Sequence, residues 1–422
     1  MPPTPTLPRA NDGQLAERLP ASTITGAQTL LFAASVGIIV TNLFAPQTLI
    51  GLIGPSLGAD AASGGLVAMA TLLGYAAGLF FLVPLADLAE NRTLIMRMLL
   101  TAALAAGIAA FAPTTASLLI VLFILGAACS AIQILVPIAA SMAPPGQDGR
   151  VIGDVMSGLM VGILLARPLA SLVADAWGWR AFYAVSASAL VLLTIVLALT
   201  LPRRQPAAKS GYPALIASLI QLLRDEPVLR RRALTASLVM AAFSLFWTSV
   251  ALRLALPPFG LGQRGIALFA LVGAGGAVVT PLFGRAGDRG WTRSATIACH
   301  LVLIAALALA AWAGDAASTT SWWPLVLMGV SAVLLDIGVT GDQTLGRRAI
   351  NLLQPKARGR LNGLFVGIFF IGGAIGSMLA GIAWTWAGWP AVCAIGAGFG
   401  VLALLVDWIG GPSASTWRDP AE

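Results

Sequence analysis

The chain consists of long apolar stretches separated by short polar breaks. A helix needs about 20 mostly apolar residues to cross a bilayer, and stretches of about that length follow one another along almost the whole sequence. We therefore expect an all-α polytopic membrane protein with twelve transmembrane helices. The expected spans are residues 26–53, 64–86, 93–113, 116–142, 151–174, 180–201, 232–256, 265–284, 293–313, 322–346, 361–384 and 388–411.

One polar segment, residues 202–231, is much longer than the other breaks and divides the spans into two groups of six. Because the other connections are short, successive helices in each group are expected to be antiparallel neighbours. The predicted organisation is a tail over 1–25, a six-helix bundle over 26–201, a linker over 202–231, a second bundle over 232–411 and a tail over 412–422.

The basic residues indicate how the helices are oriented. Nearly all of the 25 Lys and Arg residues fall in breaks on one side of the predicted membrane, the side that includes the linker and both tails. Cytoplasmic loops carry such an excess of positive charge. We therefore expect a multi-pass protein of the plasma membrane with both termini in the cytoplasm.

The composition excludes several classes of protein. Only 10% of the 422 residues are charged and 58% are hydrophobic, whereas a soluble protein carries roughly 25% charged residues. The net charge of +8 is not concentrated in a dense basic run, so no nucleic-acid partner is expected. A single histidine and three isolated cysteines, Cys129, Cys299 and Cys393, do not form a metal site. No nucleotide-binding motif is present, and we expect no cofactor, no metal and no enzymatic activity.

The two halves of the chain repeat each other. Gly178-Trp179 recurs as Gly388-Trp389, and Gly162 matches Gly372 at the same offset. An Asp followed by Arg also ends both the second and the eighth span. Parallel six-helix repeats place a binding site between the halves near the middle of the membrane, and this site can open to either side.

These motifs resemble the major facilitator superfamily over essentially the whole chain. The segment from Gly284 to Gly290 is similar to the signature loop of the family, while the first copy has Val83 and Glu90 where glycines are usual. Span 5, with Gly158, Gly162 and the sequence Ala166-Arg167-Pro168, resembles the antiporter motif of drug/proton exchangers, although a Gly-Pro pair is usual there. Asn42 to Gln47 resembles a bacterial efflux-permease branch, which implies the bacterial inner membrane.

The resemblance implies a cytoplasmic gate at the two signature loops. In the family, the loop aspartate meets the positive N-terminal end of a helix in the opposite half. Asp87 would then lie against the start of span 11, near Leu361, and Asp288 against the start of span 5, near Gly153. The expected gate residues are Asp87, Arg92, Asp288 and Arg289.

Two charges lie deep within the predicted spans and are the candidates for proton coupling. Asp336 is near the middle of span 10, and removal from water disfavours the charged form of a carboxyl group, so it could take up and release a proton. The alternative is an aspartate that only ties span 10 to a neighbouring helix. Arg167 in span 5 stays charged, so it could neutralise a carboxylate or an anionic substrate; the alternative is a purely structural arginine.

The resemblance also implies that spans 1, 4, 7 and 10 line the substrate cavity. The polar candidates are Asn42 and Gln47 in span 1, Gln133 in span 4, and Thr340 and Gln343, which share the helical face of Asp336. Phe243 and Trp247 in span 7 would form an aromatic wall for a lipophilic compound, or else pack against helices or lipid.

The sequence thus predicts a secondary active transporter that exports small lipophilic organic compounds in exchange for protons by alternating access. It would work as a monomer in the lipid bilayer, with a small-molecule substrate and protons as its partners. The alternative is an uptake symporter or uniporter for a sugar, organic acid or amino acid, in which Arg167 would bind an anionic substrate. A remote alternative is a membrane receptor or assembly protein that does not transport.

Overall fold

The computed structural model describes residues 24–58, 61–205, 211–315, 322–354 and 357–409, and all regular structure among them is helical. Both predicted tails beyond these limits, including Arg9, Arg18 and Arg418, lie outside the described residues. Ten of the described helices are long and apolar enough to cross a membrane.

We call α1 to α8 the N half. The first and fourth predicted spans are each divided into two helices, and the others are each built on one long helix. The elements are α1 (Gly26–Phe44), α2 (Pro46–Ser56), α3 (Ala61–Phe81), the 3-10 turn η1 (Val83–Asp87), α4 (Asn91–Ala110), α5 (Thr115–Cys129), α6 (Ile132–Ser141), α7 (Asp148–Trp177) and α8 (Trp179–Thr200).

We call α10 to α15 the C half, and α9 connects it to the N half. The elements are α9 (Tyr212–Asp225), α10 (Pro227–Ala255), α11 (Gln263–Gly273), the 3-10 turn η2 (Ala274–Val279), α12 (Thr280–Asp288), α13 (Thr292–Asp315), α14 (Trp323–Asn351) and α15 (Arg358–Ile409). The long α15 contains the last two predicted spans, separated by a bend at Ala387 and Gly388. Every predicted span is therefore represented by helix.

The first, fourth and eighth predicted spans are interrupted, and in the first and eighth the sequence weakens the helix at the break. The first breaks after Ala45, and Pro46 begins α2, a position where its missing N–H costs no hydrogen bond. The eighth changes to the 3-10 turn η2 at Ala274, within a glycine-rich run. The breaks place backbone and polar side chains near the middle of the predicted spans.

The predicted linker is partly helical. α9 buries Leu219 and Leu222, and the Arg360 guanidinium of α15 donates a hydrogen bond to the hydroxyl of Ser218 at 3.0 Å. α10 begins at Pro227, within the segment that we expected to be linker. The second half of the linker is thus packed against the C half.

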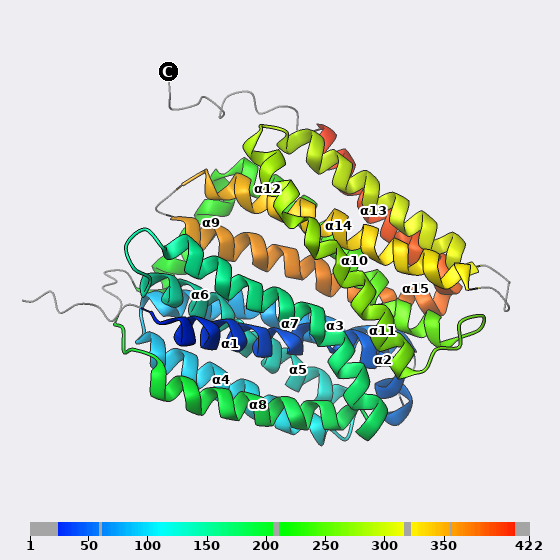
Figure 1. Ribbon diagram of the computed structural model, residues 1–422, viewed down its shortest axis with the longest axis horizontal. Helices are drawn as coiled ribbons and strands as arrows, with labels where there is room; N and C mark the ends of the chain where they lie inside the picture. Colours follow the sequence, from blue (N-terminus) through cyan, green and yellow to red (C-terminus); the bar gives the residue numbers. More distant parts are fainter. Residues whose placement is uncertain (1–23, 59–60, 206–210, 316–321, 355–356, 410–422) are drawn as a thin grey trace, which may run out of the picture.

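The two halves lie side by side, with the N half below and the yellow to red segments of the C half above (Figure 1). Three pairs of helices join them: α3 with α15, α2 with α10, and α7 with α11. The α3–α15 contact runs along α3, because Gly65 near its start meets Ser377 and Phe80 near its end meets Gly367. α12, which continues the span of α11, packs on α13 and α14 of its own half.

Small residues let helices approach closely at equivalent places in the two halves. A Cβ added at Gly162 of α7 would lie 2.4 Å from the backbone oxygen of Gly37 in α1. In the C half, a Cβ at Gly372 of α15 would lie 2.0 Å from the backbone oxygen of Ser237 in α10. Gly162 and Gly372 are the pair that the sequence repeat matched, so the repeat corresponds to a shared helix–helix contact.

We expect Gly376→Ala to destabilise the protein by about 2 kcal/mol, since overpacking costs typically 1–3 kcal/mol. A Cβ at Gly376 would lie 2.0 Å from the backbone oxygen of Ala241, which cannot move aside alone. Gly363→Ala in the same helix is the matched control, because its Cβ would meet nothing within 4 Å. Thermal unfolding in detergent measures both, and equal melting temperatures would contradict the prediction.

Candidate functional site

Arg167 is buried in α7, with an exposed fraction of 5%. Its Nε donates a hydrogen bond of 2.9 Å to Oε1 of Gln47, which lies in the first turn of α2. The break before Pro46 places Gln47 there, and the hydroxyl of Thr48 also lies 3.5 Å from the backbone oxygen of Arg167. The interruption of the first span therefore positions Gln47 and Thr48 to contact Arg167.

Three aromatic rings surround the guanidinium of Arg167. Its Cζ lies 4.2 Å from the ring centre of Trp247, 5.2 Å from that of Phe243 and 5.3 Å from that of Phe44. Such cation–π contacts are worth about 2 kcal/mol when they are desolvated. Phe44 comes from the N half, whereas Phe243 and Trp247 belong to α10 of the C half. The arginine is thus held by rings from both halves.

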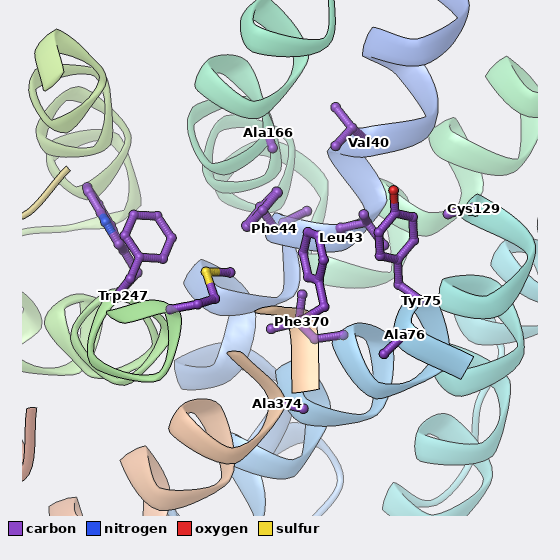
Figure 2. Packing of buried hydrophobic residues seen from close by; sticks show 14 of the residues in the cluster. Val40, Leu43, Phe44, Tyr75, Ala76, Cys129, Ala166, Trp247, Phe370 and Ala374 are labelled. Carbon is purple, nitrogen blue, oxygen red and sulfur yellow. The ribbon is translucent and has the colours of Figure 1, made fainter. Parts of the chain in front are cut away.

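The aromatic cluster continues away from Arg167 toward α3. Figure 2 shows Phe44 beside Phe370, with Tyr75 on one side of them and Trp247 on the other. The ring centres of Phe370 and Tyr75 are 4.7 Å apart, and those of Phe370 and Phe44 are 6.3 Å apart. Aromatic side chains from α1, α3, α10 and α15 therefore fill the contact between the halves.

Trp247 connects Arg167 to Asp336. While its ring stacks on the guanidinium, its Nε1 donates a hydrogen bond of 3.0 Å to Oδ1 of Asp336 in α14. Glycines of the eighth span make room for both side chains: a Cβ at Gly273 would lie 2.4 Å from the Trp247 ring, and one at Gly276 would lie 2.5 Å from the Asp336 Cβ. A positive charge of the N half and a carboxyl group of the C half thus share one indole.

Two donors in this cluster have no hydrogen-bond partner in the part of the chain that the structure describes. They are Nη2 of Arg167 and Nε2 of Gln47, both buried. Because Arg167 and Gln47 are hydrogen-bonded to each other, the two unpaired donors belong to adjacent groups. A buried donor without a partner is costly, so this is a place where an acceptor group of a ligand would bind favourably.

The structure brings Arg167, Gln47, Phe243, Trp247 and Asp336 together, and it places the other cavity candidates elsewhere. Asn42 accepts a hydrogen bond of 2.6 Å from Ser186 of α8, within the N half. Gln133 donates to the hydroxyl of Tyr75 at 3.2 Å, at the far end of the aromatic cluster. Thr340 and Gln343 are half-buried on α14. Roles for these four residues in a substrate cavity stay predictions.

The predicted gate residues have contacts within their own halves. Asp288 forms an ion pair with Arg348 of α14, and the Arg289 guanidinium lies 5.7 Å from the ring centre of Trp291. Arg92 donates to the backbone oxygen of Ala198, and Asp87 is exposed. Contacts of Asp87 and Asp288 with the opposite half stay predictions.

Glu90, which replaces a glycine of the first signature loop, has a local structural role. Its carboxylate accepts hydrogen bonds from the backbone N–H groups of Arg92 and Thr93 at 3.0 and 2.9 Å. The hydroxyl of Thr93 and these N–H groups hold the pKa of Glu90 below its usual range. Glu90 is therefore the N-terminal cap of α4.

A second group of buried charges lies inside the C half, and sequence reasoning did not bring its members together. His300 lies 3.1 Å from Asp342, and Arg232 lies 3.3 Å from Asp407. Asp407 lies within the last predicted span, and an ionisable residue within a span is a functional candidate, as it was for Asp336. Its partners could not be read from the sequence, because they come from two other helices, α10 and α13.

Comparison with known proteins identifies the class. The sequence pattern of the Major Facilitator Superfamily matches residues 30–341 and 268–422. The chain therefore belongs to this superfamily of membrane transporters and is not an enzyme, and the predicted fold class is confirmed.

Relatives with known sequences are also transporters. The chain is 36% identical over 391 residues to the uncharacterized transporter YgaY of Escherichia coli O157:H7, covering 93% of this chain and 97% of the relative. It is 30% identical over 407 residues to "Probable transporter SCO4007" of Streptomyces coelicolor, covering 95% and 92%.

Solved structures share the fold at low sequence identity. The nucleoside transporter NupG has a TM-score of 0.71 and 17% identity, covering 90% of this chain and 99% of that one. The human organic anion transporter MFSD10 has a TM-score of 0.62 and 18% identity, covering 91% and 100%. These likenesses concern the architecture alone.

We expect the charges of Arg167 and Asp336 to be energetically coupled through Trp247. Arg167→Gln should lower the melting temperature, because the Asp336 carboxylate then lacks its compensating charge. Adding Asp336→Asn should recover part of that loss, with a coupling energy of about 1 kcal/mol in a double-mutant cycle. Thermal unfolding of the four proteins in detergent tests this; strictly additive effects would contradict it.

Proposed function

We propose that this transporter exports small lipophilic organic compounds in exchange for protons, with Asp336 as the proton-binding residue. The observation that carries the proposal is the shared indole: Trp247 stacks on Arg167 of the N half and donates to Asp336 of its own half. The protonation state of one carboxyl group thereby acts on the contact between the two halves.

The charges of the cluster support a coupling between protonation of Asp336 and the contact between the two halves. With Asp336 ionised, its charge compensates that of Arg167 across the indole, and the halves attract each other at this point. A proton on Asp336 removes the negative charge, whereas the guanidinium keeps its own. The electrostatic attraction between the halves then weakens, and they can move apart at this cluster. Alternating access requires such a change at the interface of the repeats.

The surroundings of Arg167 suit an apolar compound. Phe44, Phe243 and Trp247 offer ring faces, and large apolar pockets with few polar groups bind lipophilic ligands. A groove of about 810 Å³ runs along α1 and α7. It is lined by small and apolar residues of both helices, among them Ala33, Gly37, Gly158, Gly162, Leu165 and Leu169. Leu165 and Leu169 lie two residues on either side of Arg167 and therefore on the opposite face of α7, so this groove is separate from the Arg167 cluster.

The entry of one proton releases enough free energy to drive export of a neutral compound against its gradient. One elementary charge crossing a potential of 100 mV releases about 2.3 kcal/mol, which sustains roughly a tens-fold concentration ratio for a neutral substrate.

The unpaired donors favour a second candidate function, uptake of an organic acid on the same fold. A carboxylate could accept from Nη2 of Arg167 and Nε2 of Gln47 at once, and charge-assisted bonds of this kind are strong. A proton on Asp336 would leave Arg167 as the uncompensated charge, so that the proton and the anion would bind together.

Asp336→Asn should abolish proton-driven accumulation in reconstituted vesicles while leaving downhill flux of the same compound. The asparagine keeps a hydrogen-bond acceptor for Trp247 but cannot exchange a proton. Vesicles with an imposed proton gradient are screened with lipophilic compounds and organic acids. Asp315→Asn, at the far end of α13, is the matched control. Proton-driven accumulation that persists in Asp336→Asn would refute the assignment.

Arg167→Lys distinguishes the two candidate functions, export of a lipophilic compound and uptake of an organic acid. Lysine keeps the charge but loses the planar fork that binds Gln47 and stacks on the rings. If an organic acid is the substrate, its KM should rise at least about tenfold, because one charge-assisted hydrogen bond contributes roughly 1.5–3 kcal/mol. For a neutral lipophilic compound KM should change less than about threefold. Initial rates in the same vesicles measure both values.

A further inference from the structure

The second group of buried charges lies between four helices of the C half. Nε2 of His300 in α13 is 3.1 Å from Oδ1 of Asp342 in α14. Nδ1 of the same ring is 3.8 Å from Oδ2 of Asp407 in α15. The Nη1 of Arg232 in α10 is 3.3 Å from Oδ2 of Asp407 and 3.3 Å from the hydroxyl of Thr296. The imidazole is thus flanked by two carboxyl groups.

This group is deeply buried. The side chain of His300 is fully buried, that of Asp342 is 2% exposed and those of Asp407 and Arg232 are 6% and 8% exposed. Arg231 is at the edge, 3.9 Å from Asp407 and 21% exposed. Asp342 of α14 and Asp407 of α15 lie against His300 itself. The other ionisable groups next to these two carboxyl groups are Arg231 and Arg232 of α10 and Cys299 of α13.

The two carboxyl groups beside His300 favour a proton on each imidazole nitrogen. A neutral imidazole has one N–H, and ionised carboxylates only accept. If Nε2–H donates to Asp342, an unprotonated Nδ1 turns its lone pair toward Asp407 and is repelled. Nδ1 has no hydrogen-bond partner among the described residues. Protonation of Nδ1 converts that repulsion into attraction.

Charge balance leads to the same result. Of the deeply buried members, Asp342 and Asp407 carry two negative charges and Arg232 carries one positive charge. Buried charges are stable only when they are compensated, and a protonated His300 supplies a second positive charge from within the buried group. Arg231, which is more exposed and already lies 3.9 Å from Asp407, compensates part of the negative charge when this proton leaves, so that the site tolerates both states.

We propose that His300, Asp342 and Asp407 form a second proton-binding site, located within the C half and separate from Asp336. Asp342 follows Asp336 by six residues on α14, about 9 Å along the helix at 1.5 Å per residue. The site lies near the start of α10 and the end of α15, at the end of the molecule where α9 joins the C half. This end is the one that the distribution of basic residues assigns to the cytoplasm.

The chain offers a direct test, because His300 is its only histidine. Protein purified with a histidine-free affinity tag and labelled with isotopic histidine gives one set of imidazole nitrogen resonances in nanodiscs. We expect both nitrogens to be protonated at pH 7, with reversible loss of one proton on raising the pH. A neutral imidazole at pH 7, or a ring that keeps both protons at every pH at which the protein is folded, would overturn the proposal.

Variants of the two aspartates test whether their carboxylates keep the His300 imidazole positively charged. Asp342→Asn should leave the imidazole neutral at pH 7, because one of the two carboxylates that stabilise the second proton is lost. Asp407→Asn should do the same; if this variant does not fold without a partner for Arg232, Asp342→Asn alone decides. Exposed Asp225→Asn at the end of α9 is the control and should leave the imidazole doubly protonated. An unchanged imidazole in Asp342→Asn would refute the site. The measurement needs no substrate, so its outcome is independent of the function proposed for Asp336.

Discussion

The compensation of one buried charge by another across the two halves is the constraint on which the centre of this protein depends. Arg167 cannot be discharged at ordinary pH, and an uncompensated guanidinium inside a membrane protein is unstable. Its compensation is provided by Trp247, Phe44, Phe243 and, through the indole, Asp336. Because these groups belong to both halves, the stability of the charge is linked to the way in which the halves meet.

The architecture around the charge follows from that requirement. The first span breaks at Pro46, so that Gln47 can reach Arg167, and the eighth span contains glycines where the ring of Trp247 and the side chain of Asp336 approach its backbone. On one side of the cluster, α3 packs against α15 along its length. On the other side, α7 packs against α11, but α12, which continues the same span, packs on helices of the C half. The contact between halves is therefore less extensive beside α7 than beside α3.

The sequence was sufficient to predict the spans and the two charges of the central cluster, since apolar length and a charge within an apolar stretch are local features. Arg167 and Asp336 were found in this way, and Asp407 obeys the same rule. The link through Trp247 could not be predicted, because the direction of an indole N–H depends on how α10 and α14 pack. The partner of Asn42 could not be predicted either: packing of α1 on α8 pairs it with Ser186, and its role in a substrate cavity stays a prediction.

The two clusters of buried charge differ in what a proton can do at each of them. The central cluster is divided between the halves, so in the mechanism that we propose a proton on Asp336 changes the attraction between them. The cluster around His300 lies inside one half, among α10, α13, α14 and α15. A proton there changes only contacts within that half. Since α14 carries both Asp336 and Asp342, it is the element through which one site can act on the other.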